Sequence, residues 1–90
     1  MDFSELVARE GFPPGVRVVR LPDPHGEVFY ARNADGTRGL DLLLTKEAVR
    51  IYGEGPTLAL VLRQLRLAAE AGLPERDAAG GYERQVFVGD

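Results

Sequence analysis

The sequence has no cysteine and no tryptophan among its 90 residues, and it has only one lysine and one histidine. The absence of cysteine excludes disulfides, thiolate metal sites and thiol nucleophiles. It is consistent with a reducing cytoplasm, which we expect to be the compartment. One histidine and scattered acids supply too few ligands for a metal site, and we expect neither a metal nor a cofactor.

An excess of positive charge is also missing, because the formal net charge is −3. Nucleic-acid-binding proteins usually carry a basic excess, so nucleic acid is not the expected partner. The apolar runs are far shorter than the roughly 20 residues that span a bilayer. The N-terminal segment has acids where a signal peptide has bases, which predicts a soluble protein with no membrane contact. The length favours a single domain over residues 1–90 with a small core.

Three strands are predicted in the first half of the chain. Residues 16–21 are rich in β-branched side chains, and the arginine at the edge of each face is typical of an outer strand. Residues 27–32 and 38–44 flank the segment Asn-Ala-Asp-Gly-Thr, whose turn-forming residues predict a β-hairpin. The leucines at 40, 42 and 44 share one face of the second arm, which we expect to pack against a helix.

The strongest element is a helix over about residues 57–71, where apolar residues recur at helical spacing. Its apolar stripe consists of Leu58, Val61, Leu62, Leu65, Ala68 and Ala69. A short helix is predicted over about residues 2–10. Residues 45–52 fit either a helix capped by Thr45 or a strand, and we favour the helix. A final strand is predicted over residues 82–90.

These elements predict an α+β fold, a mostly antiparallel sheet of about four strands with the long helix packed on one face. The expected order is helix, strand, strand, strand, short helix, long helix, strand. The position of the last strand in the sheet is not readable from the pattern.

The turn before the long helix is a candidate ligand site. Gly53, Gly55 and Thr57 precede an apolar helix, and backbone N–H groups at such a place can bind a phosphate. The motif lacks the third glycine of a dinucleotide loop and the Gly-Lys-Ser/Thr ending of a nucleoside-triphosphate loop. Pro56 removes a donor, and Glu54 repels an anion. A purely structural turn is therefore favoured, with a small-ligand or nucleotide-binding regulatory site as the alternative.

Catalytic residues are not nominated by any spacing in the chain. His25 lies between Asp23 and Glu27, but a Pro-His-Gly segment is typical of an exposed turn. Asp23, Glu27 and Asp41 can converge if their strands are neighbours, although solvated acids are the favoured interpretation. We therefore favour a protein that is not an enzyme.

Four arginines lie in the predicted sheet region, and together with Tyr30 they form a candidate surface for single-stranded nucleic acid. They are Arg17, Arg20, Arg32 and Arg38. Nearby acids dilute this charge, so solubility and cross-strand pairing explain the arginines better.

Spare apolar area on the long helix gives the clearest functional indication. Leu60 and Leu67 lie seven residues apart and off the main stripe, beside Arg63. Val86, in the final strand, follows a glycine-rich segment and could pair with another chain or swap between protomers. For the spare leucines alone, a wider core of the single chain is favoured over an interface. We expect a non-catalytic protein-protein interaction or assembly module, a homodimer or a subunit of a larger complex, whose partner is itself or another protein.

Overall fold

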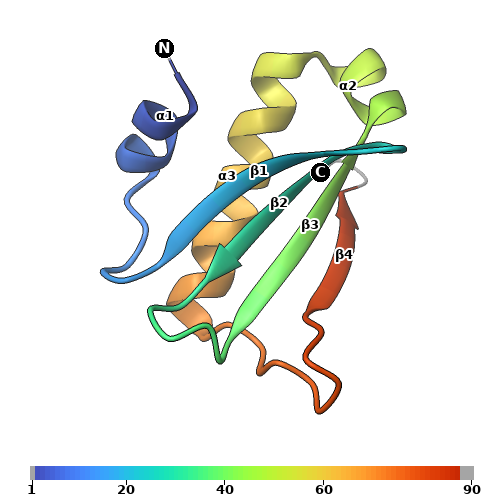
Figure 1. Ribbon diagram of the computed structural model, residues 1–90. Helices are drawn as coiled ribbons and strands as arrows, with labels where there is room; N and C mark the ends of the chain where they lie inside the picture. Colours follow the sequence, from blue (N-terminus) through green and yellow to red (C-terminus); the bar gives the residue numbers. More distant parts are fainter. Residues whose placement is uncertain (1, 88–90) are drawn as a thin grey trace.

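The computed structural model describes residues 2–87, which form three helices and four strands (Figure 1). The helices are α1 (Phe3–Glu10), α2 (Lys46–Tyr52) and α3 (Glu54–Ala71), and the strands are β1 (Arg17–Asp23), β2 (Gly26–Arg32), β3 (Gly39–Thr45) and β4 (Glu83–Phe87). The predicted α+β class and the predicted order of elements are confirmed. Residues 88–90 of the predicted final strand lie outside the described residues. Between residues 2 and 87, no helix has both the length and the apolar character needed to cross a membrane.

The four strands form one sheet in the order β1-β2-β3-β4. Strands β1, β2 and β3 are antiparallel neighbours, whereas β4 runs parallel to β3. Two of the three strand pairs are antiparallel, which confirms the predicted mostly antiparallel sheet, and the parallel third pair makes the sheet mixed. The third pair is parallel because α3 carries the chain back along the sheet, so that β4 starts at the same end as β3.

The predicted β-hairpin is formed by β2 and β3, whose register pairs Tyr30 with Asp41. Side chains of the turn bind the backbone in place of ladder partners. The Arg38 N–H donates to Asn33 Oδ1 at 3.0 Å, and the Thr37 N–H donates to Asp35 Oδ1 at 3.1 Å. Gly36 adopts a φ of 73°, which glycine tolerates without steric cost.

Side-chain caps mark the starts of α1 and α2. Asp2 Oδ1 accepts the Glu5 N–H at 2.9 Å, and Thr45 Oγ1 accepts the Ala48 N–H at 3.1 Å. The helix alternative for residues 45–52 is thereby confirmed. Helix α3 begins earlier than predicted, at Glu54. Pro56 is compatible with this start because the first N–H groups of a helix have no intrahelical partner.

One face of the sheet carries the core and is covered by α3 and α1. We call it the helix face, and it presents the side chains of Phe29, Ala31, Leu40, Leu42, Leu44 and Phe87. Four α3 residues of the predicted stripe pack on it and are buried: Leu58, Val61, Leu62 and Leu65. The short helix α2 packs at one end of the sheet, against β3 and α3. Burial of each of the four α3 side chains stabilises the fold by about 1.5–3 kcal/mol.

The other face of the sheet carries no helix of residues 2–87, and we call it the open face (Figure 1). Alternation along the strands assigns to it Val19, Leu21, Val28, Tyr30, Arg32, Asp41, Leu43, Arg84 and Val86. An apolar row crosses all four strands on this face, because the register pairs Leu21 with Val28, Val28 with Leu43, and Leu43 with Val86.

Candidate functional site

Exposed apolar side chains gather where α2 meets β4. Ile51 is 60% exposed, Tyr52 46% and Val86 50%. The three residues line a shallow hollow of about 220 Å³, which we call the α2–β4 hollow. Its remaining walls are formed by Thr45, Glu47, Ala48 and Phe87. Val86 also ends the apolar row of the open face, so the hollow and that row share this side chain.

The four residues predicted for an interface lie in two separate places. Val86 lines the α2–β4 hollow, whereas Leu60, Arg63 and Leu67 lie on α3. Leu60 is half-buried and packs against the core, and Leu67 is 47% exposed. The helix leucines therefore offer one exposed apolar side chain, while the surroundings of Val86 offer several.

A charged cluster occupies the centre of the open face. The Arg32 Nη2 atom lies 2.7 Å from Asp41 Oδ1, and the Arg84 guanidinium lies 3.9 Å from both Asp41 and Asp23. No donor among the described residues is aligned with Asp41 Oδ1 for a hydrogen bond, so its contact with Arg32 is an ion pair. The Arg32 guanidinium is stacked between two aromatic rings, 4.8 Å from the Tyr30 centroid and 3.5 Å from the Tyr82 centroid.

The predicted convergence of acids is found for two of the three residues. Asp23 and Asp41 meet at Arg84, and Asp23 does so because the tip of the β1–β2 hairpin curls toward β4 (Figure 1). Glu27 lies apart and accepts two hydrogen bonds from Arg20, one of them at 2.8 Å. The prediction of solvated acids is wrong for Asp41, which is only 8% exposed. Asp41 lies on a central strand, where neighbours on both sides cover it.

Only two of the four arginines of the predicted nucleic-acid surface are brought together. Arg17 lies opposite Arg32 in the register of β1 and β2. Arg20 lies near the Phe3 and Phe29 rings, on the helix face. Arg38 donates to the Leu73 carbonyl at 3.0 Å and to Glu75 at 3.1 Å. An acid or a carbonyl is thus the partner of each of Arg20, Arg32 and Arg38.

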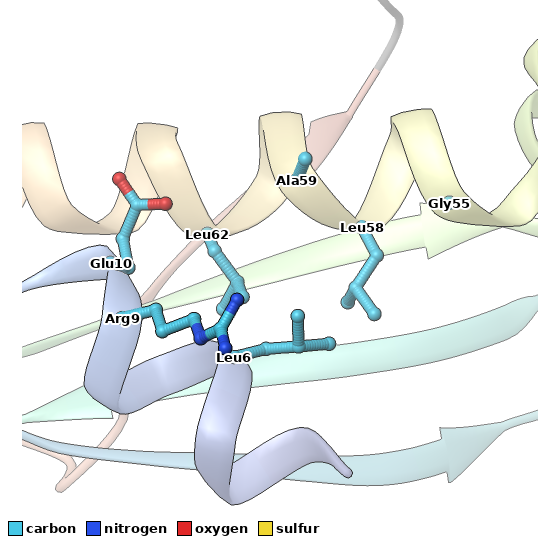
Figure 2. A pocket seen from close by; sticks show the side chains of 7 residues that line it. All are labelled: Leu6, Arg9, Glu10, Gly55, Leu58, Ala59 and Leu62. Atoms are coloured by element: carbon cyan, nitrogen blue, oxygen red, sulfur yellow. The ribbon is translucent and has the colours of Figure 1, made fainter. Parts of the chain in front are cut away.

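The Gly53–Thr57 turn is built into the start of α3. Thr57 is 0% exposed, and its hydroxyl donates to the Gly53 carbonyl at 2.8 Å. The Thr57 side chain is therefore turned inward. Gly55, by contrast, lines a hollow of about 250 Å³ between α1 and α3, which we call the α1–α3 hollow (Figure 2). Its other lining residues are Leu6, Arg9, Glu10, Leu58, Ala59 and Leu62.

Hydrogen bonds and charges shift the pKa of a few groups. The backbone N–H of His25 donates to Asp23 Oδ1 at 2.9 Å and lowers the pKa of that carboxyl. Bonds from the Thr37 hydroxyl and N–H lower the pKa of Asp35. Arg66 donates to Glu10 at 2.7 Å and to Glu70 at 3.0 Å, and both bonds raise its pKa. These groups stay charged at neutral pH and act as structural ties.

Ile51, Tyr52 and Tyr82 are the site residues that the sequence pattern missed. Residues 45–52 fitted either a helix or a strand. The pattern therefore did not predict which face of this element carries Ile51 and Tyr52. Tyr82 precedes β4, and its hydroxyl donates to the Gly36 carbonyl at 2.6 Å, a contact that no local spacing reveals. Among residues 2–87, no group of three or more His, Asp or Glu side chains is arranged to hold a metal ion.

Comparisons of the chain with protein-family models, with curated proteins and with solved structures find no match.

Proposed function

We propose that the protein is a non-catalytic interaction and assembly module that forms a homodimer through the α2–β4 hollow. The observation that carries the proposal is the gathering of Ile51, Tyr52 and Val86 around one hollow. Exposed apolar side chains that cluster mark contact surfaces more often than single ones do. The lack of cysteine supports the cytoplasm as the place where this module acts.

The charges beside the hollow support a second copy of the chain as the partner. Glu47 and Arg50 lie on α2 and form an exposed ion pair at 3.3 Å. If two copies of α2 pack antiparallel about a two-fold axis midway between Glu47 and Arg50, Glu47 of each copy comes opposite Arg50 of the other. The surface is thus self-complementary in charge, with the apolar side chains of Ile51 and Tyr52 next to the pair.

Sedimentation velocity across protein concentrations from micromolar to millimolar tests the proposal. We expect a concentration-dependent dimer for the unchanged protein. Ile51→Arg is expected to weaken it by at least tenfold, because a charge is then buried in the apolar contact. The matched control is Leu67→Arg, which places the same charge at a similarly exposed apolar position on α3.

Two results would overturn the proposal. A strict monomer at millimolar concentration would remove self-association. Loss of the dimer in Leu67→Arg but not in Ile51→Arg would move the interface to the α3 surface that includes Leu60 and Arg63.

A second candidate function is the binding of a small ligand beside Gly55. It is favoured by the α1–α3 hollow, because Gly55 forms its wall and the Arg9 side chain extends into it (Figure 2). Inorganic phosphate or a nucleotide that binds there raises the melting temperature by mass action on the folded state. An unchanged melting temperature with phosphate and with a panel of nucleotides would contradict this candidate. The nucleic-acid alternative has weaker support, since only Arg17 and Arg32 of its four arginines are neighbours.

A further inference from the structure

Helix α1 is attached to the rest of the molecule by a small set of contacts. None of its eight residues is fully buried. Phe3 packs on Phe29 with ring centroids 5.9 Å apart, and Leu6 and Val7 lie half-buried against the core. The polar tie is the bond from Arg66 of α3 to Glu10 at the end of α1.

The segment that joins α1 to β1, residues 11–15, has the composition of a hinge. Gly11 and Gly15 bound it, and both have positive φ values, 82° and 83°. Pro13 and Pro14 between them stiffen the connection and prevent α1 from continuing as a helix. Backbone changes at these two glycines are the least strained way for α1 to rotate as a rigid body.

Hollows lie on both sides of α1. The α1–α3 hollow lies between α1 and α3 (Figure 2). A second hollow of about 360 Å³ lies between α1 and β1. The second hollow is lined by Phe3, Ser4, Val7, Ala8, Val16, Arg17, Val18 and Val19. Because neither hollow is filled by protein atoms and none of its residues is buried, α1 makes fewer packing contacts than the elements of the core.

We propose that α1 is a strap that opens as a unit about Gly11 and Gly15, while the sheet and α3 stay folded. Opening breaks the Glu10–Arg66 tie and uncovers an apolar seat made of Phe29, Leu58 and Leu62. In the closed state this seat is filled by Phe3, Leu6 and Val7 of α1.

Amide hydrogen exchange of the full chain, followed by NMR at neutral pH, tests the proposal. We expect amides of residues 7–10 to exchange at least about tenfold faster than those of residues 61–65, since the strap opens without global unfolding. Glu10→Gln is expected to speed exchange in residues 7–10 several-fold and to leave residues 61–65 unchanged.

Glu70→Gln is the matched control, because Glu70 binds the same Arg66 but does not belong to α1. It is expected to leave exchange in α1 unchanged. Equal exchange rates in α1 and α3, or equal effects of the two variants on α1, would overturn the proposal. The strap does not depend on self-association, so the exchange of α1 should be the same in Ile51→Arg as in the unchanged protein. A difference there would also overturn it.

Discussion

The two faces of the sheet are built on different principles. The helix face has an apolar centre, and α3 packs against it. The open face combines an apolar row with an ion-paired cluster in which Asp41 contacts Arg32 and Arg84, and two tyrosine rings pack on Arg32. Burial by a helix needs only apolar residues at the right spacing, whereas burial without a helix depends on specific pairs. Mutations on the helix face should therefore lower the free energy of unfolding according to the side-chain volume that they remove. Mutations on the open face should lower it when they break a pair.

The largest effect is expected on the helix face. Leu65→Ala removes a fully buried side chain from α3 and leaves a cavity against the sheet. We expect the free energy of unfolding to fall by about 3–4 kcal/mol. Urea denaturation measures this directly. A loss below about 1 kcal/mol would mean that the core collapses into the space.

A smaller effect is expected when the cluster on the open face loses its acid. Asp41→Asn keeps the shape of the side chain but leaves Arg32 and Arg84 without their shared carboxylate. We expect a loss of about 2 kcal/mol, because Arg32 is partly buried and keeps its charge. Denaturation at high salt is the control. If the loss disappears in salt, the cluster acts as a surface charge and the contrast between the faces is weaker.

Gly39→Ala tests the packing of the same cluster without changing a charge. A Cβ at position 39 would lie 2.7 Å from Tyr82 Cδ1 and 2.8 Å from Arg32 Cδ. The Tyr82 ring is fixed by its hydroxyl bond to Gly36, so we expect a loss of about 1–2 kcal/mol. Melting temperature reports it. The control is Gly55→Ala in α3, where an added Cβ meets nothing within 4 Å.

The smallest effect concerns pH. The pKa of Asp23 and that of Asp35 are both lower in the folded chain than in the unfolded one. Their contribution to stability is therefore complete above the unfolded pKa of about 3.9 and is lost as the pH falls through the folded pKa. Asp35→Ala should lower the melting temperature at pH 7 and have less effect near pH 3. An equal effect at both values would contradict the linkage.

The sequence predicted the helix face well because periodicity alone defines it. The spacing of Leu58, Val61, Leu62 and Leu65 predicted the buried stripe of α3, and Thr45 predicted the start of α2. The parallel direction of β4 was not predictable, because it depends on the path of α3 over the sheet. The open face was only partly predictable. Asp23 and Asp41 were recognised as acids that can converge, but their common partner Arg84 lies more than forty residues further along the chain.

Strand β3 pairs with β2 through a short turn and with β4 only after the whole of α2 and α3. When synthesis has reached α3 but not β4, β3 is therefore still an edge strand. Its unpaired backbone groups can then pair with those of other nascent chains. Docking of β4 ends this period of vulnerability. Its pairing is also the most distant in sequence, so completion of the sheet is expected to be a late step in folding.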